Sequence, residues 1–146
     1  MPDPTVLQLV GLANAARRGG DAEGGAAAAD AEPALERAFG CSQRLAVYGT
    51  LAPGECNHHL LAACPGPWVH GAVHGRMVER RFRMFTYDPA GTAVPVQMLR
   101  SPGLASHWAQ LDAFEHPTHH RILVPVFAAG RLLAVANLYA ACDPVE

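Results

Sequence analysis

Apolar and polar positions alternate along the second half of the chain in a pattern that predicts β-strands. Residues 68–78, WVHGAVHGRMV, interleave apolar side chains with histidine and glycine, which is typical of a bent or bulged strand. Residues 93–99 form an apolar run with one polar residue, Gln97, in its middle. The runs 121–127 and 132–139 flank an Ala-Gly-Arg turn, so we expect them to pair as a hairpin.

Helical spacing of apolar residues occurs in three segments. Residues 5–18 carry an apolar stripe preceded by Asp-Pro and followed by Gly-Gly, which are start and stop signals for a helix. Residues 32–39 predict a short second helix with Pro33 in its first turn. Residues 104–114, LASHWAQLDAF, predict the clearest helix of the second half.

The order of these elements indicates the fold class. Strands interrupted by short helices, without regular βαβ alternation, favour an α+β fold built on a mixed or antiparallel sheet. We expect residues 44–146 to form one domain and residues 1–43 to be an N-terminal helical extension. Residues 19–31 consist almost wholly of Gly, Ala, Asp and Glu, so we expect a flexible linker there.

Composition narrows the class of protein. The chain has 146 residues, half of them apolar, which suffices for one sizeable core. Its net charge is −2, so it lacks the basic surplus that binding to nucleic acid requires. It also lacks an apolar run of the roughly 18 residues that a membrane span needs and a secretory signal pattern. We therefore expect a cytoplasmic protein that binds neither nucleic acid nor membrane; the sequence gives no indication of its oligomeric state.

The cysteines and histidines do not predict a metal site or another cofactor. The four cysteines lack Cys-x-x-Cys spacing, and we expect them to be reduced, small apolar residues. Cys56, next to Asn57-His58-His59, leaves a nucleophilic role open. The adjacent histidine pairs, 58–59 and 119–120, point apart on a strand, and no His-Glu-x-x-His pattern is present.

The segment 45–61, LAVYGTLAPGECNHHLL, is the strongest candidate for a ligand site. An apolar strand stops at Gly49-Thr50, and Pro53-Gly54 follow before order resumes in a short helix or turn. A strand that ends in a glycine turn leaves successive N–H groups without ladder partners. Such groups can converge on a carboxylate or a developing oxyanion. The alternative is a turn that only connects two elements.

Two motifs in order make the chain resemble a known family. Val47-Tyr48-Gly49-Thr50-Leu51 comes first, His107 to Glu115 (HWAQLDAFE) follows, and Arg121 then precedes a strand. On these residues, about Arg44 to Ala141 resembles the γ-glutamylcyclotransferase-like family. The resemblance implies a small mixed β-barrel with flanking short helices. It also implies that the loop Tyr48, Gly49, Thr50 and Leu51 binds a γ-glutamyl head group, partly through backbone groups.

The chemistry that this resemblance implies is an intramolecular cyclisation. The substrate's α-amine attacks its own γ-carbonyl, which releases an amine and 5-oxoproline. Family members use a glutamate base on the strand before the second motif, usually after a glycine. Here Val96-Gln97 stands in that place, and an amide cannot accept the proton. Thr118-His119 also replaces a frequent Gly-Tyr, and residues 82–87 lack a frequent Gly-Tyr-Pro.

Two functions therefore follow from the sequence. The first is a cyclotransferase or lyase acting on a γ-glutamyl amine, with Gln97 orienting the substrate and Glu115, Glu55 or His119 serving as the base. The second is a catalytically impaired relative that binds a small molecule in the loop without turning it over. Glu115 also has a purely structural interpretation, because a carboxylate at a helix C-terminus opposes the helix dipole unless a partner such as Arg121 offsets it.

Overall fold

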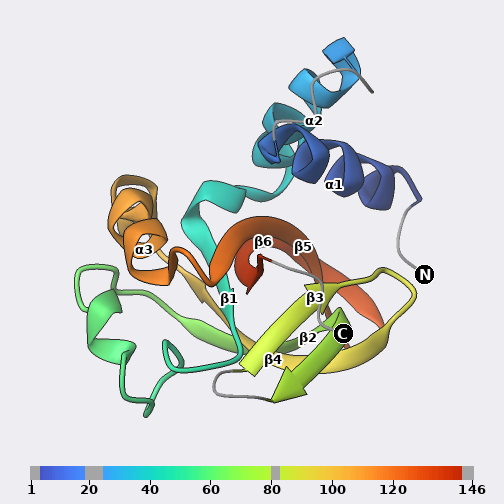
Figure 1. The fold of residues 1–146 in the computed structure, drawn as a ribbon. Helices are drawn as coiled ribbons and strands as arrows, with labels where there is room; N and C mark the ends of the chain where they lie inside the picture. The colour runs from blue at the N-terminus through green and yellow to red at the C-terminus, as the bar shows by residue number, and fades with distance from the viewer. Residues whose placement is uncertain (1–3, 19–24, 80–82, 143–146) are drawn as a thin grey trace.

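The computed structural model describes residues 4–18, 25–79 and 83–142. Two helices, α1 (Pro4–Arg17) and α2 (Gly25–Phe39), lie together on one side of a curved sheet (Figure 1). A third helix, α3 (Trp108–Glu115), lies on another side. The strands are β1 (Arg44–Val47), β2 (Trp68–Glu79), β3 (Arg83–Tyr87), β4 (Thr92–Arg100), β5 (His119–Ala128) and β6 (Arg131–Ala141).

The described strands form one mixed sheet that closes into a barrel. Their order is β3-β2-β4-β1-β6-β5, and β2 also pairs with β5 through Ala72 and Phe127. Strand β1 runs parallel to β6, whereas the other pairs are antiparallel. The ring β2-β4-β1-β6-β5 is therefore closed, with β3 attached to β2 as a hairpin. This confirms the expected α+β fold with a small mixed barrel.

Glycines allow β2 to bend around the barrel, as its sequence pattern predicts. A Cβ on Gly71 would lie 2.8 Å from Cγ1 of Val126 and 3.0 Å from the carbonyl oxygen of Phe127. A Cβ on Gly75 would lie 2.5 Å from the ring of Phe85. Only glycine permits these approaches, so β2 can meet β5 at one end and wrap the fully buried Phe85 at the other.

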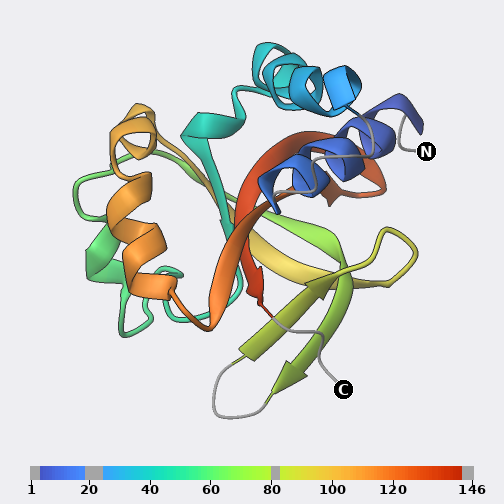
Figure 2. The same cartoon turned by 45° about the horizontal axis from the view of Figure 1, so that its top comes forward.

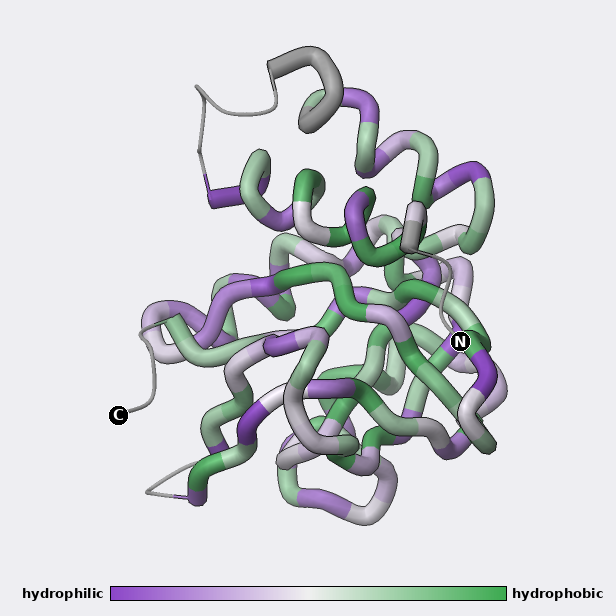
Figure 3. Tube along the Cα trace, turned by 90° about the vertical axis from the view of Figure 1, so that its right-hand side faces the viewer, coloured by the Kyte–Doolittle hydropathy of each residue, from purple (hydrophilic) through white to green (hydrophobic). Residues whose placement is uncertain are grey.

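Alternating residues of the strands fill the barrel and leave a second apolar face outside it. The interior holds Phe85 and the alternating residues of β4, β5 and β6. Outside the barrel, β1 packs against the loop after it, the short 3₁₀ helix His58–Leu61 and α3, through Leu45, Val47, Leu61, Trp108 and Leu111. Green, hydrophobic stretches follow the strands in the middle of the molecule (Figure 3).

The helical extension packs on the outer face of β5 and β6. Val10 and Leu35 form an apolar cluster with Leu123 and Val135. The side chain of Asn14 accepts a hydrogen bond from the N–H of Leu123 and donates one to its C=O, both at 2.8 Å. Asn14 thus takes the place of a neighbouring strand along this part of β5, where α1 lies across it (Figure 2).

Two helix boundaries differ from the sequence prediction. Helix α2 begins at Gly25, inside the segment expected to be a linker, and Pro33 lies within the helix rather than in its first turn. The alanine-rich segment has high helix propensity, which outweighs its lack of bulky side chains. The predicted helix 104–114 is a 3₁₀ turn, Pro102–Ser106, followed by α3. Residues 19–24 of the expected linker lie outside the described residues.

Among the described residues, no helix is long and apolar enough to cross a membrane.

Candidate active site

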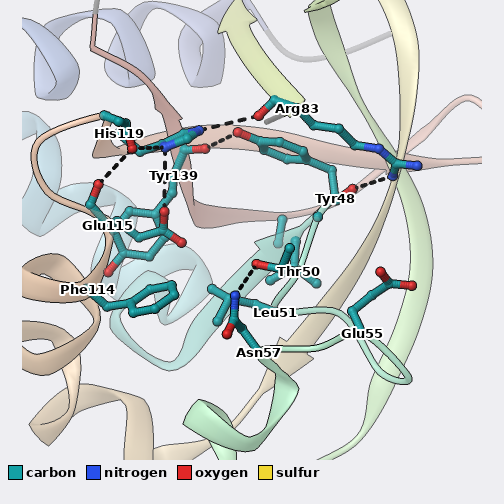
Figure 4. A pocket seen from close by; sticks show the side chains of 14 residues that line it. Tyr48, Thr50, Leu51, Glu55, Asn57, Arg83, Phe114, Glu115, His119 and Tyr139 are labelled. Atoms are coloured by element: carbon teal, nitrogen blue, oxygen red, sulfur yellow. Dashed lines mark hydrogen bonds and ion pairs between the residues drawn. The ribbon is translucent and has the colours of Figure 1, made fainter. Parts of the chain in front are cut away.

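A cavity of about 420 Å³ opens between the loop after β1, the end of α3 and the hairpin strand β3. The loop residues Tyr48, Gly49, Thr50 and Leu51 line it, together with Glu115 and His119 (Figure 4). The two motifs of the sequence thus meet in one cavity. Its wall also includes residues for which no role was predicted, namely Asn57, Arg83, Phe114, Thr118 and Tyr139.

The loop beside the cavity has N–H groups that no described residue accepts from. The carbonyl oxygen of Gly49 accepts from the N–H of Ala52, and that of Thr50 accepts from the N–H of Asn57. Asn57 also donates to Oγ1 of Thr50 at 2.9 Å. Within the described residues, the N–H groups of Gly49, Thr50 and Leu51 have no acceptor. Such a set of donors is suited to a carboxylate or a carbonyl oxygen.

Tyr48 fixes the position of the loop against the barrel. Its hydroxyl donates to the carbonyl oxygen of Tyr139 at 2.5 Å, and its ring packs against Phe85 with centroids 5.7 Å apart. Burial, and secondarily the nearby carboxyl of Glu115, raises the pKa of Tyr48 well above its ordinary value. The hydroxyl therefore remains a hydrogen-bond donor at neutral pH.

Glu115 places a buried carboxyl at the end of α3, inside the cavity. Its side chain is only 14% exposed, and desolvation raises the pKa of this carboxyl to about 7. A carboxyl with a pKa in this range is partly ionised at neutral pH and can accept a proton. Arg121 does not offset the charge of Glu115, because its guanidinium pairs with Asp112 at 2.9 Å and lies 4.5 Å from the ring centre of Trp108.

His119 is the immediate neighbour of that carboxyl. Its Nδ1 lies 3.6 Å from Oε2 of Glu115 and 2.9 Å from the Thr118 hydroxyl, while Nε2 lies 3.4 Å from the carbonyl oxygen of Arg83. A carbonyl can only accept, so Nε2 carries the proton and Nδ1 accepts from the Thr118 hydroxyl, with the Glu115 carboxyl nearby. Burial lowers the pKa of His119, which favours this neutral form.

Arg83 contributes the positive charge of the cavity wall. Its Nη1 donates to the carbonyl oxygen of Tyr48 at 2.9 Å, and its Nε pairs with Glu79 at 3.1 Å on the exposed side of the hairpin. In Figure 4 the guanidinium lies across the cavity from Glu115. Arg83 had no role predicted from the sequence, because only the pairing of β2 with β3 brings it to the loop.

Tyr139 was also missed, because its strand carried no chemical motif. The parallel pairing of β1 with β6 matches Leu45 with Asn137, and this register brings Tyr139 beside Val47. The Tyr139 hydroxyl donates to Oδ1 of Asp112 at 2.6 Å. The sequence indicated Tyr139 only indirectly. Side chains alternate between the two faces of a strand, so Tyr139 takes an outward-facing position on the predicted hairpin strand.

Gln97, the residue at the place of the family's base, lies beside the cavity rather than among its lining residues. It pairs with Val47 in β1 and with His70 in β2, so its half-buried side chain shares a face with Val47, which does line the cavity. No described residue forms a hydrogen bond with its amide. A role for Gln97 in orienting a substrate remains a prediction.

The remaining candidates take other positions. Glu55 lines the outer part of the cavity but is exposed, and Cys56 beside it is exposed too. His58 and His59 direct Nδ1 to the backbone oxygens of Leu51 and Cys56, at 2.9 Å and 3.2 Å. The four cysteines form no disulfide with one another, and burial raises the pKa of Cys41 to about 12. No group of three metal-binding side chains occurs among the described residues.

Solved structures share this fold at low sequence identity. An uncharacterised protein from Pyrococcus horikoshii matches with a TM-score of 0.56 at 14% identity, over 70% of this chain and 80% of its own. YkqA from Bacillus subtilis matches with a TM-score of 0.56 at 24% identity, over 68% of this chain but 36% of its own. A mouse AIG2-like protein, GGACT, matches with a TM-score of 0.52 at 19% identity, over 71% of this chain and 80% of its own.

The sequence itself carries the family assignment. No sequence among the curated proteins matches the chain significantly. The profile described as gamma-glutamyl cyclotransferase, AIG2-like, matches residues 45–145, which include the barrel except for the first residue of β1, the loop and α3. The chain therefore belongs to the gamma-glutamyl cyclotransferase, AIG2-like family.

Proposed function

We propose that this protein cyclises a γ-glutamyl amine to 5-oxoproline and releases the amine, with Glu115 as the general base. The observation that carries the proposal is the Glu115 carboxyl, buried in the same cavity as the Tyr48 to Leu51 loop with its pKa raised to about 7. Family membership supports the reaction class, and the cavity supplies a base in spite of Gln97.

The substrate's γ-glutamyl head carries an α-carboxylate, an α-ammonium group and a γ-carbonyl. The guanidinium of Arg83 and the N–H groups of Gly49, Thr50 and Leu51 offer donors for the two oxygen-bearing groups. The α-ammonium group is then directed toward Glu115, the only buried carboxylate among the described lining residues. This orientation matches each charge of the head group with an opposite charge.

The reaction needs no co-reactant. Glu115 takes a proton from the α-ammonium group, the freed amine nitrogen attacks the γ-carbonyl carbon, and a C–N bond forms as the five-membered ring closes. Loop N–H groups stabilise the oxyanion of the tetrahedral intermediate. The leaving nitrogen takes the proton held by Glu115, and the bond from this carbon to that nitrogen breaks. Glu115 then takes the second proton of the ring nitrogen and passes it to the released amine, which leaves as an ammonium ion.

A second function is favoured by one specific observation. Gln97 stands where the family resemblance places a glutamate base, and its amide cannot accept a proton. A chain with this change would bind the γ-glutamyl head in the same loop without cyclising it. In that case Glu115 would be a structural group of the cavity.

Release of 5-oxoproline from a panel of γ-glutamyl amines separates the two functions. We expect release by the native protein and a loss of about 10²–10⁴ in rate for Glu115→Gln, the usual contribution of a positioned base. Glu55→Gln is the matched control, because it removes an exposed carboxylate from the same cavity. No release by the native protein, with clear release by Gln97→Glu, would establish the binding function instead.

A further inference from the structure

A continuous chain of polar contacts connects the N-terminal extension with the wall of the cavity. It begins at Glu32 of α2, whose two carboxylate oxygens each accept from Arg17 of α1 at 2.8 Å. Arg17 then donates to Oδ1 of Asn137 at 2.8 Å, and Arg121 donates to the same oxygen at 3.1 Å. Arg121 is bonded to both carboxylate oxygens of Asp112.

The chain ends at the cavity. Oδ1 of Asp112 accepts the hydroxyl proton of Tyr139, whose backbone oxygen in turn accepts from Tyr48. Asp112 also lies one helical turn before Glu115 on α3, so both residues occupy the same side of that short helix. The contacts of Arg121 and Tyr139 with Asp112 therefore fix the part of α3 that carries Glu115.

Asn137 makes the two halves of the chain depend on each other. It is 1% exposed, its oxygen accepts from two guanidinium groups, and its nitrogen donates to the backbone oxygen of Cys41 at 2.8 Å. Two positive charges that converge on one buried amide need nearby negative charge on both sides. Asp112 supplies it on the cavity side, and Glu32 supplies it on the extension side.

Apolar packing alone does not account for this arrangement. The extension already has an apolar cluster against Leu123 and Val135. Asn14 already forms hydrogen bonds with the N–H and C=O of Leu123 in β5. Arg17 adds polar contacts beside this cluster, to Asn137 and the backbone oxygen of Arg121. These contacts do not add apolar area, and they lie at the beginning of the path to the cavity.

We propose that Arg17 and Glu32 of the N-terminal extension are positioning residues that hold Tyr139 and the end of α3 in place through Asn137, Arg121 and Asp112. The extension is then part of the site and not an appended element. The inference rests on the proposed function, because only that function gives Tyr139 and Glu115 a part in substrate binding and turnover.

The test uses full-length Arg17→Gln and Glu32→Gln, with Arg37→Gln as the control. Arg37 is exposed on α2 and takes no part in these contacts. The first readout is the titration of the Glu115 carboxyl by ¹³C NMR in the ligand-free protein, assigned by its loss in Glu115→Gln. We expect the pKa of Glu115 to fall toward its ordinary value in both test variants and to stay unchanged in Arg37→Gln.

In Arg17→Gln, the direction of the shift separates positioning from a simple change of charge. In Glu32→Gln both effects lower the pKa of Glu115, so that variant supports the test without deciding it. Loss of the positive charge of Arg17 would by itself raise the pKa of a nearby carboxyl. Loosening of Tyr139 and α3 would admit water to Glu115 and lower it. Arg17→Lys keeps the charge but cannot form the same fork with Glu32 and Asn137, so we expect an intermediate shift. An unchanged titration in folded Arg17→Gln would overturn the proposal.

A double variant decides the matter if the single variants do not fold. Arg17→Met with Glu32→Leu replaces the pair by apolar side chains, a change that proteins often tolerate. We expect this variant to fold and to show the lowered pKa of Glu115; a folded double variant with the native titration would refute the inference.

The second readout is kcat and KM for γ-glutamyl methylamide, for which we expect kcat/KM to fall about tenfold in Arg17→Gln. If the native protein releases no 5-oxoproline, the proposed function fails while the titration still decides this inference.

Discussion

Oε2 of Glu115 lies 3.6 Å from Nδ1 of His119, and the two side chains are only 14% and 9% exposed. The neutral histidine accepts from the Thr118 hydroxyl at Nδ1, at 2.9 Å, and its Nε2 faces the carbonyl oxygen of Arg83. A neutral His119 therefore places no positive charge beside this carboxyl. Burial then favours the proton-bearing form of Glu115.

The first prediction concerns the pH dependence of 5-oxoproline release. Glu115 must be ionised to act as a base, and its pKa is raised to about 7. We expect kcat/KM to rise with pH from 5 and to level off above about 8. Rates measured from pH 5 to 9 check this; a profile that is already flat from pH 5 would mean that the base is another group with an ordinary carboxyl pKa.

The second prediction concerns stability. The folded pKa of Glu115 lies above its unfolded value of 4.5, so the folded state binds more protons between pH 4.5 and 7. Stability therefore falls as pH rises through this window, by about 1–3 kcal/mol.

Glu115→Gln removes the free-energy cost of ionising this buried carboxyl. We expect its free energy of unfolding to exceed that of the native protein at pH 8, and to lose this advantage at pH 4.5. Urea unfolding at the two pH values measures both differences. Glu55→Gln, which alters an exposed carboxylate, should show no comparable change between the two pH values.

The third prediction concerns recognition of the head group by Arg83. Its guanidinium is 57% exposed, so the contact with a substrate carboxylate is partly screened by water. We expect Arg83→Gln to raise KM about tenfold with a smaller change in kcat, since charge-assisted hydrogen bonds contribute about 1.5–3 kcal/mol at most. Arg131→Gln, an exposed change in the distant β5–β6 turn, is the control. A loss confined to kcat would contradict the binding role.

The fourth prediction concerns the hydrogen bonds between Asn14 of α1 and Leu123 of β5. Asn14→Ala removes both hydrogen bonds to Leu123 and leaves a buried N–H and C=O without partners. We expect a loss of about 2–4 kcal/mol in the free energy of unfolding, because each unsatisfied buried group costs about 1–3 kcal/mol. Gln8→Ala, an exposed change on the same helix, should stay within about 0.5 kcal/mol. Urea unfolding midpoints compare the three proteins; equal midpoints would show that the extension contributes little to the fold.

Local patterns in the sequence determined most of the secondary structure. The alternation in β2, the apolar run of β4, the β5–β6 hairpin and the helix α1 lie within a few residues of their predicted bounds. Each of these has a local pattern of apolar and polar residues that predicts its secondary structure. The start of α2 was missed because an alanine-rich segment is equally typical of a linker and of a helix that packs on another element.

The sequence by itself also determined the family, since the Tyr48 to Leu51 loop and the end of α3 carry short, ordered motifs. Only the tertiary structure decided which groups share the cavity. Arg83 and Tyr139 reach it through strand pairing, and Arg17 reaches Asn137 across 120 positions of the chain. The raised pKa of Glu115 has the same origin: desolvation depends on which elements exclude water from a carboxyl, and these come from distant parts of the sequence.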